Sequence, residues 1–402
     1  MKLTKQQSRL LLAVLLIALF QMPHLALTPA IDKIQSVVFP ARSLSEVQEA
    51  FSLTNFVIPI MAVISALLIN RGVLTKRASV LGGLCLLTVC GVTAILLHTQ
   101  FWHLRLLSVI LGAALGLFIS NAMGIMFDNF SSDERQKIAG YQTSCINGGG
   151  ILMSLAGGAL GAYIWFGGYL VLLAGVLIAA YAFFALPKTA RALQPRAKEN
   201  ARRSKLRPRV YYYSAVIGVF MVLHTVGGAN ISTHLTQAGA SNPALAGFAV
   251  AVQMAGGVLT GIFFGKLSAK LGDLLLSAAC LALFVGYALL GVFPHSIPVT
   301  FAAMFIAGMS MSLMVPRCMF AISSLVDESS SALATAISNS VTPSLGGFIS
   351  PFFFTRVTLR LFGEATGPRY LFTAGAAILV AAALTLVTLR RRVSEPPAAR
   401  QE

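Results

Sequence analysis

The stretch LRLLSVILGAALGLFISNAMG, residues 104–124, decides the fold class. It contains 21 residues with Arg105 as its single charge, and about 20 apolar residues suffice for a helix to cross the hydrocarbon core of a bilayer. Similar runs recur along the chain of 402 residues, of which 56% are hydrophobic and 11% charged. Ordinary soluble domains have roughly 25% charged residues. The composition excludes a water-soluble globule and predicts an all-α polytopic membrane protein.

Twelve apolar runs predict twelve transmembrane helices joined by short connections. They are residues 10–31, 45–69, 79–98, 104–127, 139–163, 168–186, 211–233, 244–265, 274–293, 298–324, 333–354 and 370–389. Pro23, His24 and Asp32 interrupt the first run, which follows a basic start. We therefore interpret this run as a retained helix and not as a cleaved signal peptide.

The distribution of basic residues predicts the orientation. With the N-terminus in the cytoplasm, 23 of the 30 Lys and Arg residues fall on the inner side. The outer loops then contain five, namely Lys33, Arg42, Arg356, Arg360 and Arg369. By the positive-inside rule, both termini are expected in the cytoplasm.

The polar stretch 188–210 divides the chain. It contains nine basic residues and a single acidic one, Glu199. We interpret it as a cytoplasmic linker lying against anionic headgroups, and charge alone does not support nucleic-acid binding. The predicted parts are a six-helix bundle at 1–187, the linker at 188–210, a second six-helix bundle at 211–390 and a cytoplasmic tail at 391–402.

The two halves repeat each other. A shift of 196 residues aligns Gly112 with Gly308, Leu117 with Leu313, Met123 with Met319, Ser144 with Ser340, Gly150 with Gly346 and Ser154 with Ser350. The same shift aligns the fourth predicted helix with the tenth and the fifth with the eleventh. Two six-helix repeats are typical of transporters that expose a midplane site alternately to each side.

Two loops carry a family resemblance. ALLINRGVLTKR (66–77) and GKLSAKLGD (265–273) resemble the Gly-x-x-x-Asp-Arg-x-Gly-Arg loop of the major facilitator superfamily, and the likeness extends over essentially the whole chain. The resemblance implies gating roles for Asn70, Arg71, Gly265, Lys270 and Gly272. The family's Asp is matched by the uncharged Asn70 and Ala269, so the family's charged cytoplasmic latch is implied to be weak or differently made.

The fourth and fifth helices resemble the family less completely. The family's fourth helix has an Arg about one turn before a Gly; here Ser108 occupies that place, and Arg105 lies one turn further out. The fifth helix, residues 140–161, is rich in glycine but has no Gly-Pro pair of the drug/proton antiporter type. Its glycines are expected to allow close contact between membrane helices.

Polar residues inside the spans are the functional candidates. Gln21, His24, Thr28 and Asp32 recur at three- and four-residue steps in the first helix, which predicts one polar face toward a central cavity. His24 suits proton coupling because histidine titrates near neutral pH; a neutral His bonded to a neighbouring helix is the alternative. The seventh helix has His224, Gly227, Asn230 and His234 on a similar face.

Arg317 and Glu49 are the remaining charged candidates. Arg317 can pair with a carboxylate across the cavity, brace the cytoplasmic gate, hold an anionic substrate or extend to the inner surface. Glu49 can carry a proton, pair with Arg105 or Lys33, or lie solvated near the mouth. Asn121, the repeat mate of Arg317, and Gln142, Asn147 and Gln253 add uncharged polar groups.

We therefore predict a secondary active transporter that moves a small organic molecule by alternating access, with proton-coupled efflux. An organic-anion transporter in either direction and a non-transporting sensor are the alternatives. We expect no enzymatic activity, cofactor, metal or nucleic-acid partner, and a monomer in the bilayer of a bacterial cytoplasmic membrane. The predicted substrate and proton pathway comprises Gln21, His24, Asp32, Glu49, Arg105, Asn121, Gln142, Asn147, His224, Asn230, Gln253 and Arg317.

Overall fold

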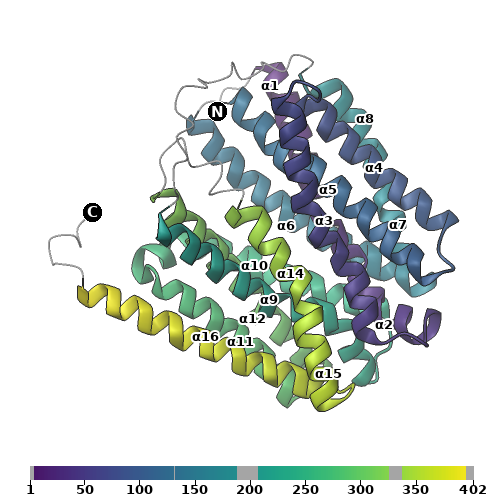
Figure 1. Ribbon diagram of the computed structural model, residues 1–402, viewed down its shortest axis with the longest axis vertical. Helices are drawn as coiled ribbons and strands as arrows, with labels where there is room; N and C mark the ends of the chain where they lie inside the picture. The colour runs from purple at the N-terminus through teal and green to yellow at the C-terminus, as the bar shows by residue number, and fades with distance from the viewer. Residues whose placement is uncertain (1–3, 131, 188–206, 326–336, 395–402) are drawn as a thin grey trace. The chain divides into compact units, whose positions relative to one another are not determined.

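The computed structural model describes residues 4–130, 132–187, 207–325 and 337–394, and the regular structure in these ranges is helical (Figure 1). The helices up to residue 187 are α1 (Lys5–Leu19), η1 (Pro23–Ala26), η2 (Thr28–Ala30), α2 (Ile31–Lys33), η3 (Ile34–Val38), α3 (Leu44–Asn70), α4 (Lys76–Leu96), α5 (Phe101–Asn129), α6 (Ser132–Tyr163), α7 (Gly167–Leu170), η4 (Val171–Ala174) and α8 (Gly175–Ala185). Those beyond it are α9 (Pro208–Gln237), α10 (Pro243–Leu271), α11 (Leu274–Val292), α12 (Ile297–Ser323), η5 (Ile337–Val341), α14 (Thr342–Ser350), η6 (Pro351–Thr355), α15 (Arg356–Phe362) and α16 (Thr366–Ser394).

The number of spans agrees with the prediction in part. Ten of the described helices are long and apolar enough to cross a membrane, and the bent pair Lys5–Leu19 and Pro23–Val38 makes up to eleven. The region predicted as the eleventh of twelve helices consists, from residue 337, of η5, α14, η6 and α15 in succession. Most of the predicted linker, 188–206, and residues 395–402 of the tail lie outside the described residues. The cytoplasmic placement of both termini remains a prediction.

Contacts divide the chain into two compact units. The first comprises Met1–Lys205, Ile231–Thr236 and Ala240–Ala251. The second comprises Leu206–Asn230, Gln237–Gly239 and Val252–Glu402. The last turns of α9 and the first turns of α10 therefore belong by contact to the first unit.

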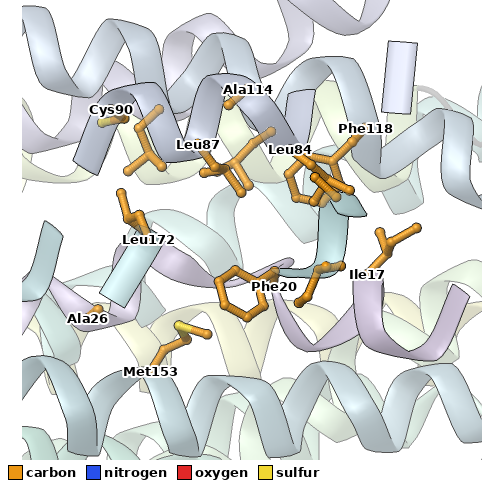
Figure 2. Close-up of a cluster of buried hydrophobic side chains, with 14 of the residues drawn as sticks. Ile17, Phe20, Ala26, Leu84, Leu87, Cys90, Ala114, Phe118, Met153 and Leu172 are labelled. Carbon is orange, nitrogen blue, oxygen red and sulfur yellow. The ribbon is translucent and has the colours of Figure 1, made fainter. Parts of the chain in front are cut away.

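The core of the first unit is apolar and is built by helices distant in sequence. α4 packs against α5, α5 against α3, and α1 against α6. Figure 2 shows side chains from these helices converging, among them Ile17 from α1, Leu84 from α4, Phe118 from α5 and Met153 from α6, each at most 4% exposed. Burial of such side chains from several helices holds the polar residues described below in defined positions.

Glycines set the closest helix contacts in both units. A Cβ atom added to Gly112 in α5 would lie 2.6 Å from the carbonyl oxygen of Thr54 in α3. Its repeat mate Gly308, in α12, lies at least as tightly against the backbone of Gln253 in α10. In the second unit α11 also packs against α12 and α16. The equivalent crossings support the predicted internal duplication, and they follow because only glycine lets the two backbones approach so closely.

Candidate functional site

The first predicted span is broken near its middle. α1 ends at Leu19, and short 3-10 segments follow after a bend of 44°. Pro23 and Pro29 have no backbone N–H, so they cannot continue the α-helical hydrogen-bond ladder. The predicted continuous helix over 10–31 is therefore wrong. The segments that carry Gln21, His24, Thr28 and Asp32 do not share one helical period, and their common polar face toward a central cavity remains a prediction.

The break places His24 in η1, beside the half-buried Gln21. The Nδ1 atom of His24 is buried and has no hydrogen-bond partner among the described residues. Buried polar atoms are normally hydrogen-bonded, so an unpaired ring nitrogen is unusual. This unpaired nitrogen keeps His24 among the candidate site residues.

Glycines of α6 seat the broken segment. A Cβ atom on Gly149 would overlap the Leu19 carbonyl oxygen, and one on Gly157 would overlap that of Ala26. Gly158, by contrast, lies against the backbone of Pro243 and Gly247 at the start of α10. The expected packing role of the glycine-rich fifth helix is confirmed. α6 forms a close backbone surface against both ends of the break.

Asp32 is held beyond the break by the end of α9. Its side chain is only 7% exposed, and its Oδ2 atom accepts a hydrogen bond of 2.8 Å from the hydroxyl of Thr236. Ser232, one turn earlier in α9, donates a hydrogen bond of 2.8 Å to the carbonyl of Pro29. The adjacent Lys33 donates to the carbonyls of Gly161 and Ala162 in α6. All these groups belong to the first unit.

His224 of α9 lies in a polar and aromatic setting within the second unit. Its ring stacks on Phe220 with centroids 5.4 Å apart, and its Nδ1 atom lies 3.5 Å from the Ser310 hydroxyl of α12. The hydroxyl of the buried Tyr287, from α11, donates to the His224 carbonyl at 2.7 Å and accepts from the N–H of Gly227 at 2.9 Å. The Tyr287 hydroxyl thus forms hydrogen bonds with backbone groups of α9 at His224 and Gly227.

Asn230 is fully buried, and its amide is bonded on both sides. Its nitrogen donates to the Val226 carbonyl at 2.8 Å, and its oxygen accepts a hydrogen bond from Nη1 of Arg369 in α16. Nε of Arg369 donates to the Thr358 hydroxyl of α15 at 3.2 Å. The prediction that Arg369 lies in an outer loop is wrong, because Arg369 belongs to α16 and is 0% exposed inside the second unit.

Arg317 of α12 forms an ion pair with the residue that precedes α11. Its Nε and Nη2 atoms donate to Oδ1 of Asp273 at 3.1 and 2.9 Å. Nη1 reaches the Ser268 hydroxyl of α10 at 3.3 Å, and the Tyr213 hydroxyl of α9 donates to the other Asp273 oxygen at 2.7 Å. The network joins four helices, an arrangement that suits a brace.

Asn121 makes the equivalent connection in the first unit. Its side-chain nitrogen donates to Ser65 of α3 at 2.7 Å and to Ser79 of α4 at 3.0 Å. Asn121 and Arg317 thus each tie their own helix to the second and third helices of the same half. The first unit has a neutral connection where the second has a charged one.

The two predicted gating loops have matching turns. Gly72 and Gly272 both adopt positive φ, 73° and 56°, shortly before α4 and α11. A left-handed backbone conformation of this kind favours glycine. Arg71 is the C-cap of α3, Lys270 and Gly265 are exposed, and the Asn70 side chain lies outside the described part of the chain.

The other predicted site residues are placed as follows. Glu49 in α3 is 9% exposed and Gln142 in α6 is 2% exposed, and Oε1 of Gln142 has no partner among the described residues. Asn147 is half-buried, Gln253 is 4% exposed, and Arg105 lies over the Phe101 ring at 5.2 Å.

The predicted residues meet partners that the sequence reading did not select. These are Thr236 for Asp32, Ser310 for His224, Arg369 for Asn230, and Asp273 for Arg317. Arg369 and Asp273 lie next to loops by hydropathy, so the burial of Arg369 and the pairing of Asp273 could not be predicted from the sequence. Tyr287 gave no signal either, because a tyrosine in an apolar run is compatible with ordinary packing.

Residues 10–351 and, in a second match, 224–402 fit the family model of the Major Facilitator Superfamily. The solved structures that this chain resembles include that of the nucleoside transporter NupG, with 12% identity, a TM-score of 0.72, and coverage of 95% of this chain and 99% of the other. The POT family transporter PepTSo gives 12% identity, a TM-score of 0.76 and coverage of 98% and 100%.

A bacterial homologue of the human lysosomal transporter Spinster, in an inward-facing and occupied conformation, gives 17% identity, a TM-score of 0.68 and coverage of 97% and 98%. At such low identities these likenesses show the fold alone. None of the curated proteins matches the chain.

Proposed function

Because the chain belongs to the Major Facilitator Superfamily, we propose that it moves a small organic solute across the membrane by alternating access, with export coupled to proton entry. The membrane is the cytoplasmic membrane of a bacterium, and the protein works as a monomer. Two six-helix repeats with short connections are the build that such a mechanism uses.

The observation that carries proton coupling is the bond between Asp32 and Thr236. It joins a buried titratable carboxylate to the end of α9, a helix that continues into the second unit. A hydrogen bond to an ionised acceptor is roughly twice as strong as one between neutral groups. The Thr236 hydroxyl therefore donates a stronger hydrogen bond to ionised Asp32 than to protonated Asp32.

This difference in bond strength links a proton to a movement. Protonation of Asp32 weakens the bond to Thr236 and favours its opening, and loss of the proton favours its closing. His24, on the same broken segment and with an unpaired ring nitrogen among the described residues, is the next group able to accept that proton. One proton-linked change in the position of α9 would follow from each opening and closing.

The test uses sealed vesicles with purified protein and an imposed pH gradient. Asp32→Asn is expected to abolish gradient-driven accumulation of solute and protein-dependent proton flux, while solute exchange without a gradient continues. Asp and Asn have similar volumes, and Asn still accepts the Thr236 bond, so the fold is expected to persist. Asp128→Asn, at the partly exposed ion pair with Lys76, is the matched control and should behave as wild type.

Lipophilic cations and organic anions are supplied in turn, so the same vesicles report the class of solute. Gradient-driven accumulation by Asp32→Asn at the wild-type level would contradict the proposed coupling site. Absence of transport of every solute by the wild type would contradict the transporter proposal itself and would favour a sensor.

Transport of an organic anion is the second candidate function, and Arg369 favours it. A pump for lipophilic cations is expected to place carboxylates in its pathway, whereas the most buried charged side chain of the described residues is this arginine. Arg317 does not serve this argument, because Asp273 already neutralises it.

A further inference from the structure

We propose that Arg369 and Asn230 form a subsite for the carboxylate group of the solute. The proposal rests on the proposed transport function and deepens it by naming the chemical class of the substrate. The subsite lies within the second unit, where α9, α15 and α16 meet.

The first argument is burial without a direct ion pair: Glu364 attracts the guanidinium electrostatically, but no carboxylate lies within ion-pair distance of it in the described chain. Arg369 is 0% exposed, and its two bonded nitrogens meet neutral acceptors, the Thr358 hydroxyl and the Asn230 amide oxygen. Its third nitrogen, Nη2, is buried and has no partner among the described residues. A guanidinium group stays protonated in proteins, and an intramembrane charge normally has a partner or faces a pathway.

The second argument is the contrast with Arg317 in the same unit. Arg317 is more exposed, with a side chain 16% accessible, yet it has the carboxylate of Asp273 at 2.9 Å. Arg369 is less accessible, but no carboxylate lies within ion-pair distance of it in the described chain. The less solvated of the two cations is thus the one that retains an open donor, which is expected of a group that receives its anion from a ligand.

The third argument concerns the kind of anion. One guanidinium flanked by a neutral amide and a hydroxyl balances one negative charge, which favours a monocarboxylate over a phosphate dianion. Arginine donates in a planar fork that matches the geometry of a carboxylate. Nη2 supplies one donor of the fork, and Nη1 supplies the other once the Asn230 oxygen is displaced.

Access requires α9 to separate from the start of α16, a movement within the second unit. Thr366 lies one turn before Arg369 in α16. Its backbone N–H and its hydroxyl donate hydrogen bonds of 2.9 and 2.7 Å to the side-chain oxygen of Gln237, at the end of α9. The amide nitrogen of Gln237 donates to the Glu364 carbonyl at 2.8 Å. These bonds close α9 onto the start of α16 and would open with the movement of α9.

The decisive variant is Asn230→Asp. It replaces the amide oxygen that Arg369 contacts by a carboxylate of nearly the same size, which supplies an internal anion. If Arg369 only clamps helices, this change strengthens the clamp and leaves ligand binding unaltered. If Arg369 receives a carboxylate from the solute, the internal anion blocks it.

The measurement is the unfolding temperature of the purified full-length protein in neutral detergent, with sodium benzoate, phenylacetate or lactate and with the corresponding uncharged amides. At least one carboxylate should stabilise the wild type while its amide does not. Inorganic phosphate should stabilise it less. Asn230→Asp should unfold at or above the wild-type temperature without ligand, and should bind the same carboxylate about tenfold more weakly or worse. Arg369→Met should bind none where it folds.

Four results would overturn the subsite, and the first three concern binding. They are carboxylate binding by Asn230→Asp at the wild-type level, equal stabilisation by the amides, and no stabilisation of the wild type by any carboxylate tested. Failure of Asn230→Asp to fold would also overturn the subsite, since a buried cation without an ion pair should be stabilised by a new carboxylate beside it. Binding in detergent needs no gradient, so the two proposals can fail separately. Carboxylate binding without transport in vesicles would refute the transport proposal alone. Transport of cations without carboxylate binding would refute the subsite alone.

Discussion

At the scale of single residues, the Arg317–Asp273 pair is the best-defined charged contact of the second unit. The Asp273 carboxylate accepts two hydrogen bonds from the Arg317 guanidinium and one from the Tyr213 hydroxyl. Loss of this carboxylate would therefore leave both side chains without their acceptor. The pair is partly solvated, with side chains 16% and 22% exposed, which reduces its strength below that of a fully buried pair.

We predict that Asp273→Asn lowers the free energy of unfolding by about 1.5–3 kcal/mol, the range for hydrogen bonds to charged groups. Thermal unfolding of the purified protein measures this effect. Arg42→Gln, at an exposed pair with Glu46, should cost less than about 1 kcal/mol and serves as the control. Equal effects of the two substitutions would show that the Arg317 network does not brace the helices.

The residue scale also shows what the loop resemblance could and could not predict. It implied a latch that is weak or differently made, because Asn70 and Ala269 carry no charge. The structure places the charge four residues after Ala269, at Asp273, where Arg317 reaches it from α12. Sequence spacing does not reveal this pairing, because the two residues are brought together only by the packing of α11 against α12.

At the scale of elements, some glycines of α6 lie in close contact with a neighbouring segment and others face open space. A Cβ atom on Gly157 would overlap the Ala26 carbonyl of the broken first span, whereas one on Gly148 would meet nothing within 4 Å. Both residues lie in the same helix, so differences in helix propensity between them are small.

We predict that Gly157→Ala destabilises the protein by about 1–3 kcal/mol or more through overpacking. Gly148→Ala should be neutral, or should stabilise α6 by about 0.5–1 kcal/mol through helix propensity. Unfolding temperatures and expression levels of the two variants in parallel measure the difference. Similar behaviour of both would mean that α6 does not rest on the backbone of the break.

Hydropathy predicted the presence of most helices but not the breaks within them. Long apolar runs predicted most spans correctly, because length and composition suffice for a membrane helix. The first run was predicted as one helix although Pro23, His24 and Asp32 interrupt it, and its break follows from the two missing N–H groups of Pro23 and Pro29. The region from residue 337 is divided in a comparable way, with Pro343 and Pro351 near the starts of α14 and η6.

At the scale of the whole molecule, the internal duplication was the most informative pattern in the sequence. The pairs Gly112 and Gly308, and Asn121 and Arg317, make equivalent contacts inside their own halves. The repeat could be predicted because close helix crossings require particular residue types. The polar partners could not, because one half uses neutral groups and the other charged ones for the same connection.

The orientation of the whole chain remains a prediction from charge, and two exposed loop residues allow it to be tested. Arg42 precedes α3 and is expected outside, while Lys270 precedes the turn before α11 and is expected inside. In a background where the five native cysteines are replaced, a membrane-impermeant maleimide added to intact cells should label Arg42→Cys at once. It should label Lys270→Cys only after permeabilisation. The reverse pattern would place both termini outside and would invert the direction of every proton-coupled step proposed above. Labelling of both sites in intact cells would contradict the odd number of spans that the prediction places between residues 42 and 270.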